Sequence, residues 1–148
     1  MKPFTVVAAG LSAFLFVTAV RAQQSVAPTI DVVRDPGCGC CLGWVAHLQR
    51  AGFKTTVVES ADRLKNSKVP ASARSCHTGK VGGYLVEGHV PADDIKRLLR
   101  ERPNVVGIAA PGMPAGSPGM EMPGGAAPPY DVVSFDASGN TKVFASHR

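Results

Sequence analysis

Four cysteines carry most of the chemical information in this 148-residue chain. Three lie within four residues, in Cys38-Gly39-Cys40-Cys41, and the fourth is Cys76. Cys38 and Cys41 have the C-x-x-C spacing of a dithiol redox site, and Cys40 adds a third sulfur beside them. Thiolates are the nucleophiles of disulfide exchange and soft ligands for Cu(I) or zinc. The cluster predicts thiol redox chemistry, with Cys38 and Cys41 as the catalytic pair, or metal binding by the sulfurs.

Structural disulfides are the alternative that four cysteines suggest first in a chain with an export signal, which is described below. The spacing argues against two such bridges, because Cys76 is the one cysteine that lies outside the cluster. At least two of the three clustered thiols must pair with each other or stay free. A Cys38–Cys41 bridge would be short and of the reducible kind found in redox sites. The arrangement therefore favours electron or metal exchange.

Three methionines, Met113, Met120 and Met122, lie in one stretch, 111–129, in which 6 of 19 residues are proline and 5 are glycine. Such a composition predicts a loop without regular structure. Methionine usually fills gaps in a core, but none of the three falls on a predicted core face. Cu(I) accepts thioether ligands whereas zinc rarely does. The methionines therefore favour copper over zinc.

The histidines are less informative. His77 adjoins Cys76 and is the best candidate for a further ligand or for a group that orients one. His89 precedes Pro91 at a strand-to-helix turn, where it could orient a ligand or cap the turn, and we expect the cap. We expect His47 to be solvated and His147 to lie in a frayed tail.

The elements that must position these residues follow an α/β pattern. Runs rich in β-branched residues predict strands, and apolar residues at helical spacing predict helices. The expected strands cover 29–34, 53–58, 81–86, 130–135 and 141–145, the last two as a hairpin. The expected helices run from Cys41 to a C-terminal cap at Gly52, over 61–68, and from Pro91 to Arg102. This order predicts a small mixed sheet with helices packed on it, and places Cys76 in a loop that can face the other cysteines.

The N-terminal segment has the pattern of an export signal. Lys2 is followed by an apolar run, 4–20, and Val20-Arg21-Ala22 has the small residues of a cleavage site. About 17 apolar residues lie at the low end of the range that spans a bilayer, and polar residues follow at once. We therefore expect a signal peptide over 1–22, cleaved after Ala22, and a single exported domain over 23–148 that is free of the membrane. In a bacterium, its compartment is the periplasm.

Composition excludes several classes of protein. With 18% charged and 45% hydrophobic residues, the chain is not a disordered tail. Without Lys2 and Arg21 the net charge falls from +5 to +3. Because no cluster of Lys and Arg stands out and aromatics make up 6%, nucleic-acid binding is not expected.

Taken together, four segments resemble the CopG family of small exported copper-resistance proteins, and the resemblance extends from about Thr29 to Phe144. The segments are Asp35-Pro-Gly-Cys-Gly-Cys-Cys41 with Trp44 and Leu48, Ser75-Cys-His-Thr78, Gly83-Tyr-Leu-Val-Glu-Gly-His-Val-Pro91 and Pro111-Gly-Met-Pro-Ala-Gly-Ser-Pro-Gly-Met-Glu121.

The resemblance implies a thioredoxin-like fold, copper bound by the cysteines and a role in copper or thiol redox chemistry. It allows a multinuclear Cu(I)–thiolate cluster. The ligands it implies are the four cysteines, Cys38, Cys40, Cys41 and Cys76, with Met113 and Met120 in second rank. The extra Cys40, and the absence of proline from the tetrapeptide, depart from ordinary thioredoxins and argue against simple disulfide reductase activity.

The sequence thus predicts a periplasmic copper-binding protein of copper resistance, with copper ions and other periplasmic copper-handling or redox proteins as partners. Two alternatives stay open. One is a thiol–disulfide oxidoreductase, an enzyme without a physiological metal. The other is a binding module stapled by disulfides.

Overall fold

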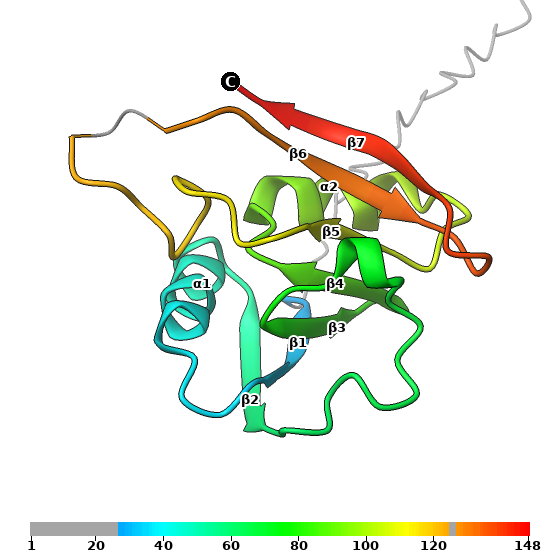
Figure 1. The fold of residues 1–148 in the computed structure, drawn as a ribbon, viewed down its shortest axis with the longest axis horizontal. Helices are drawn as coiled ribbons and strands as arrows, with labels where there is room; N and C mark the ends of the chain where they lie inside the picture. The colour runs from blue at the N-terminus through cyan, green and yellow to red at the C-terminus, as the bar shows by residue number, and fades with distance from the viewer. Residues whose placement is uncertain (1–26, 125–126) are drawn as a thin grey trace, which may run out of the picture.

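The computed structural model describes residues 27–124 and 127–148, so the expected signal peptide over 1–22 lies outside the described residues. The described residues form seven strands, two α-helices and one short 3-10 helix, η1 (Figure 1). In chain order these are β1 (Thr29–Arg34), α1 (Gly39–Arg50), β2 (Lys54–Glu59), η1 (Ala71–Ala73), β3 (His77–Val81), β4 (Tyr84–Gly88), α2 (Ala92–Glu101), β5 (Gly107–Ala110), β6 (Tyr130–Phe135) and β7 (Thr141–His147).

The strands form a single mixed sheet in the order β2-β1-β3-β4-β5-β6-β7. β1 is parallel to β2 and β4 is parallel to β5, while the other neighbours are antiparallel. Helices α1 and α2 are the crossovers of the two parallel pairs, as parallel pairing requires. The expected α/β class with a mixed sheet is confirmed.

Both helices pack on the same face of the sheet. Leu48 of α1 and Leu98 of α2 belong to one buried cluster with Ile30, Val86 and Ile108 of the strands. The opposite face carries a smaller cluster, Val69, Ala73, Ala109 and Phe135, to which the segment before β3 contributes. Apolar side chains at helical spacing in α1 and at alternate positions in the strands produce this core.

The expected third strand, 81–86, is wrong as a single strand. It spans the end of β3, a tight turn and the start of β4, which pair as an antiparallel hairpin. The turn residues Gly82 and Gly83 have φ values of +56° and +92°, which glycine adopts most easily. Two glycines between β-rich runs are a hairpin signal, so the sequence did contain this turn.

The expected helix over 61–68 is also wrong. Residues 61–66 form turns, with hydrogen bonds from Lys65 N to Asp62 O and from Ser67 N to Leu64 O in place of a helical ladder. Asn66 has a φ of +62°, which no α-helix contains. Tertiary contacts of Arg63, described below, override the weak helical pattern of this stretch.

Strand β5 was not predicted, because four residues of small and apolar type give no clear periodicity.

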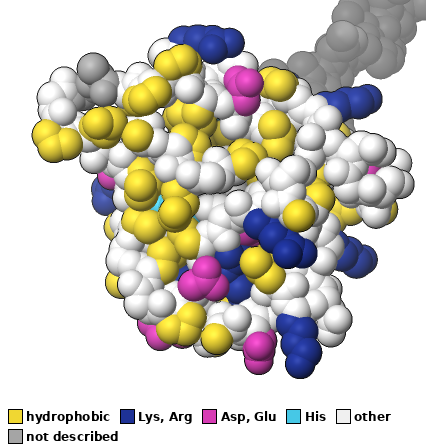
Figure 2. Space-filling model, in the orientation of Figure 1, with side chains coloured by type: hydrophobic (Ala, Val, Ile, Leu, Met, Phe, Trp, Pro, Cys, Tyr) yellow, Lys and Arg dark blue, Asp and Glu magenta, His cyan; other side chains and the backbone are white. Residues whose placement is uncertain are grey.

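Residues 111–124 contain no helix or strand. Figure 2 shows apolar side chains gathered where this segment lies against α1, while charged side chains are spread over the rest of the visible face. None of the helices in the described part of the chain has the length and hydrophobicity needed to span a bilayer.

Candidate metal centre

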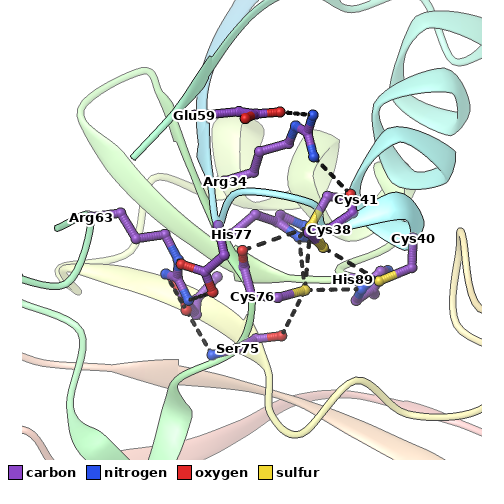
Figure 3. Close-up of a disulfide and its surroundings, with 12 residues drawn as sticks. Arg34, Cys38, Cys40, Cys41, Glu59, Arg63, Ser75, Cys76, His77 and His89 are labelled. Carbon is purple, nitrogen blue, oxygen red and sulfur yellow. Dashed lines mark hydrogen bonds and ion pairs between the residues drawn. A yellow bond between two sulfur atoms is a disulfide. The ribbon is translucent and has the colours of Figure 1, made fainter. Parts of the chain in front are cut away.

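All four cysteine sulfurs meet at the N-terminus of α1, with Sγ atoms within 4.8 Å of one another (Figure 3). Cys38, the residue that caps the helix, is joined by a disulfide to Cys41. Cys40 Sγ lies 3.5 Å from Cys38 Sγ, and Cys76 Sγ lies 3.4 Å from Cys41 Sγ. The expectation that Cys76 faces the other three sulfurs is therefore confirmed.

Backbone hydrogen bonds hold the two cysteine-bearing segments together. Asp35 N donates to Cys76 O at 3.0 Å, which joins the end of β1 to the start of β3. Gly37, with a φ of +73°, turns the chain from β1 into the helix. The Arg34 guanidinium donates to Cys38 O at 2.9 Å. The sulfurs thus lie in the first turn of α1 and just before β3, beside the end of the interior strand β1.

Two buried histidines face the sulfurs. His77 Nδ1 lies 3.2 Å from Cys41 Sγ and 3.5 Å from Cys76 Sγ. His89 Nε2 lies 3.6 Å from Cys76 Sγ, and its other nitrogen, Nδ1, is 2.8 Å from Pro118 O. The carbonyl accepts a hydrogen bond only from a protonated Nδ1, so Nε2 of His89 presents its lone pair to Cys76.

Burial keeps both imidazoles neutral. Desolvation, helped by the neighbouring His89, lowers the pKa of His77 to about 3. Desolvation also lowers the pKa of His89. Trp44 covers His77, with ring centroids 4.3 Å apart, and donates its indole N–H to Val90 O at 2.8 Å. Neutral imidazoles are the form that binds transition metals.

The thiol of Cys76 is held in its protonated form. Burial raises its pKa to about 11, against a hydrogen bond from Ser75 that favours the thiolate. A soft metal ion that binds Cys76 must therefore displace a proton.

The sequence analysis missed an ion-pair network that connects the two segments carrying the cysteines. The Arg63 side chain, 1% exposed, donates to Asp35 at 2.8 Å and to Glu87 at 3.1 Å. Glu87 is fully buried and also accepts from Ser75 N at 2.7 Å and from the Thr78 hydroxyl at 2.5 Å. These contacts fix the residues just before Cys38 and Cys76. The sequence signal that could have revealed this network is Glu87, a charged residue that directly follows the apolar run Tyr84-Leu85-Val86 of β4.

The segment 111–124 contacts the cysteine helix. Gly119 lies very close to Gly43 of α1. A Cβ added to Gly43 would come 2.9 Å from the Cα of Gly119. Met120 is half-buried, whereas 42% of Met113 and 45% of Met122 are exposed. The expectation that a methionine sulfur contacts a metal stays a prediction.

Three histidine expectations are wrong. His47 is not simply solvated, because its Nε2 accepts the N–H of Ala92 at 3.0 Å and so caps α2. His89, for which a turn cap was favoured over orienting a ligand, instead faces Cys76. His147 does not fray, since it ends strand β7 and its Nε2 lies 2.8 Å from Asp94. Tertiary neighbours far apart in the sequence decide all three outcomes.

The donor set fits a soft metal ion. Four sulfurs, three of them on half-buried cysteines, and two buried neutral imidazoles converge at the N-terminus of α1, and no carboxylate belongs to either ligand group found in the described residues. Thiolate donors select Cu(I) and zinc, and imidazoles suit copper and zinc, whereas hard cations prefer oxygen.

Two solved structures are similar to this chain. Both are named copper resistance protein CopG, in forms 1 and 2. Form 1 is 50% identical, covering 82% of this chain and 98% of that chain, with a TM-score of 0.76. Form 2 is 49% identical, covering 83% of this chain and 100% of that chain, with a TM-score of 0.74. Residues 73–120 match the family described as protein of unknown function DUF411, and no curated protein matches.

Proposed function

Because the chain belongs to the CopG family of copper resistance proteins, we propose that it binds copper as cargo and holds Cu(I) through its clustered cysteine thiolates. The observation that carries the proposal is the convergence of Cys38, Cys40, Cys41 and Cys76 within 4.8 Å. Soft thiolates prefer Cu(I). Sulfurs this close can bridge neighbouring ions, so we propose that more than one Cu(I) binds.

Cu(I) binding requires the reduced protein. The Cys38–Cys41 disulfide must take up two electrons and two protons before four thiols are available. Each thiol that then binds copper loses its proton. Met113 and Met120 are proposed as thioether ligands of second rank, since the segment that carries them lies against α1.

A redox role is the second candidate, and the Cys38–Cys41 disulfide favours it. In the proposed step, these two thiolates give one electron to each of two Cu(II) ions. The products are the disulfide and two Cu(I) ions, so electrons and charge balance. The protein would then act as a copper/thiol oxidoreductase, and a periplasmic redox protein would have to reduce the disulfide again.

The proposal includes location and fold. We propose that residues 1–22 are a signal peptide, cleaved after Ala22, and that residues 23–148 form one periplasmic domain. We also propose that this domain is thioredoxin-like. The β1–α1–β2 unit followed by β3–β4–α2, with a dithiol at the start of α1, supports this classification.

Competition of the reduced protein against a colorimetric Cu(I) chelator tests the copper proposal. We expect more than one Cu(I) per chain, and we expect Cys38→Ser or Cys41→Ser to lose most of this binding. Met122→Ala is the control, because this side chain is exposed and lies outside the proposed ligands. Submicromolar binding that survives replacement of all four cysteines would contradict the proposal.

Anaerobic addition of Cu(II) to the reduced protein separates the redox candidate from simple sequestration. The redox candidate predicts that one Cu(I) forms for each thiol that is oxidised. Reduction of insulin disulfides by metal-free protein would instead favour an oxidoreductase without a physiological metal.

A further inference from the structure

A cavity of about 720 Å³ lies on the face of the sheet opposite the two helices. Successive side chains of a strand point to opposite faces of its sheet. Ile30 and Val32 of β1 belong to the buried cluster under the helices, so Asp31 and Val33 point into the cavity on the other face. The cavity is therefore separated by the sheet from the body of α1, and none of the four cysteines is among its lining residues.

The floor of the cavity is apolar. It is lined by Val33, Leu85, Val105 and Val106. Leu85 and Val106 also pack against the smaller buried cluster of this face, which fixes their positions. Pockets for small molecules usually have volumes of about 300–1,000 Å³ and mostly apolar walls. The size and the floor of this cavity therefore suit a small ligand with an apolar body.

Three exposed lysines also line the cavity, Lys65 and Lys68 from the segment after β2 and Lys80 from β3. Within the part of the chain that the structure describes, none of these lysines forms an ion pair. The acidic residue among the lining residues is Asp31, whose carboxylate accepts a hydrogen bond from the Thr56 hydroxyl at 2.6 Å. Because the unpaired ammonium groups outnumber this carboxylate, the cavity attracts an anion.

Arg63 forms part of the cavity wall but supplies no free charge. Its guanidinium donates to Asp35 at 2.8 Å, and to Glu87 and Thr78 at 3.1 Å. Its side chain is only 1% exposed. Since two carboxylates already hold this arginine, it gives the cavity a fixed wall, and the three lysines remain as the groups that can bind an anion.

We infer that this cavity is a binding site for a small organic anion with an apolar body, such as an aryl or alkyl carboxylate or sulfonate. The apolar body lies on Val33 and Leu85, and the anionic group binds the lysine ammonium groups. The inference does not depend on copper binding, because the cavity shares no residue with the two ligand groups at α1.

Two fluorescent probes test this inference. Anilinonaphthalene sulfonate has an aromatic body and a sulfonate, and its fluorescence rises in apolar surroundings. Phenylnaphthylamine is the matched neutral probe, because it has the same rings without the sulfonate. We expect the folded protein to bind one sulfonate probe per chain. The neutral probe should bind about tenfold more weakly, since it lacks three partly exposed ion pairs.

Replacing all three lysines tests the role of charge. The variant Lys65→Gln/Lys68→Gln/Lys80→Gln should bind the sulfonate probe about tenfold more weakly, because the same ion pairs are lost. Its affinity for the neutral probe should stay unchanged, because the apolar floor is intact. An unchanged affinity for the sulfonate probe would overturn the inference.

The matched control removes three positive charges elsewhere. The variant Lys96→Gln/Arg100→Gln/Lys142→Gln changes residues of α2 and β7 that lie outside the cavity. It should bind both probes as the parent protein does. Equal losses of sulfonate affinity in the two triple variants would show general attraction to a basic chain and would overturn the inference.

Val33→Trp tests the location, because a large ring at this position fills the cavity and Val33 belongs to neither buried cluster. This variant should bind neither probe. Should it not fold, amide NMR shifts of the parent protein with the sulfonate probe decide. We expect shifts at Lys80 and Leu85 but not at Lys142.

Two NMR outcomes would overturn the inference. Shifts confined to α1 and the segment 111–124 would place the probe on the other apolar surface of the protein. No shift with the sulfonate probe, together with shifts at Lys80 on addition of hexaglutamate, would assign the cavity to an acidic segment of a partner protein.

Discussion

Arg63 joins the two segments that carry the cysteines. Its buried guanidinium lies between Asp35, which precedes the cysteine turn, and Glu87, which binds the backbone next to Cys76. Burial raises the pKa of Glu87, although Thr78, Ser75 and Arg63 all favour its ionised form. The carboxylate is therefore buried at a cost, which Arg63 partly offsets.

We predict that Arg63→Met lowers the free energy of unfolding by about 3–5 kcal/mol, because it leaves a buried charge without its partner. The pKa of Glu87 should rise further. A raised folded-state pKa contributes stability below the unfolded pKa that is lost as pH rises, so the defect should be larger at pH 8 than at pH 5. Urea unfolding at both pH values measures it.

The double variant Arg63→Met/Glu87→Gln should recover part of the loss, since it removes the unpaired charge. Lys96→Met is the control. Its ion pair with Asp93 is exposed and should contribute no more than about 1 kcal/mol. An equal cost for Arg63→Met and Lys96→Met would show that the buried network does not support the site.

At the scale of elements, the segment 111–124 is held to α1 by close backbone packing. A Cβ on Gly119 would lie 2.6 Å from Trp44 N and 2.7 Å from Cys40 O, and Gly119 has a φ of +84°. The neighbouring Pro118 carbonyl orients His89. The loop therefore contributes to the geometry of the site through its backbone, whatever its methionines bind.

We predict that Gly119→Ala destabilises the protein by about 2–5 kcal/mol, combining the left-handed backbone cost with overpacking against α1. Gly112→Ala is the matched control. Gly112 lies in the same segment with a φ of +71° and has nothing within 4 Å of an added Cβ, so it should cost only about 1–2 kcal/mol. Urea unfolding compares the two. Equal losses would mean that the loop does not dock on the helix.

At the scale of the whole molecule, the main apolar cluster is built without the disulfide, although Cys41 is itself fully buried. The main cluster joins both helices to the sheet through buried side chains, and no cysteine is part of it. The Cys38–Cys41 bridge closes a loop of only four residues. The fold thus depends on the core, and the cysteines are free to change oxidation state.

We predict that the reduced, metal-free protein stays folded. Its free energy of unfolding should fall by at most about 2 kcal/mol, which is the loop-closure contribution of a disulfide that closes so short a loop. Cu(I) at 100 times its dissociation constant should raise the free energy of unfolding of the reduced protein by about 2.7 kcal/mol. Fluorescence of Trp44, the single tryptophan, reports urea unfolding with and without reductant. Unfolding on reduction alone would contradict this and would make the disulfide structural.

The sequence by itself determined the elements with strong local signals and the chemistry of the cysteine cluster. Strand β1, helices α1 and α2 and the β6–β7 hairpin follow from periodicity and turn residues, which act between near neighbours. The three sulfurs of one turn are close whatever the rest of the chain does.

The sequence allowed Cys76 to face them, but only the tertiary structure decided that it does and which other distant residues join it. Cys76, His77 and His89 reach the cluster because β3 and β4 pair beside β1. Arg63 leaves its expected helix because two buried or half-buried carboxylates bind it. Such contacts join residues that are far apart along the chain, and no local pattern encodes them.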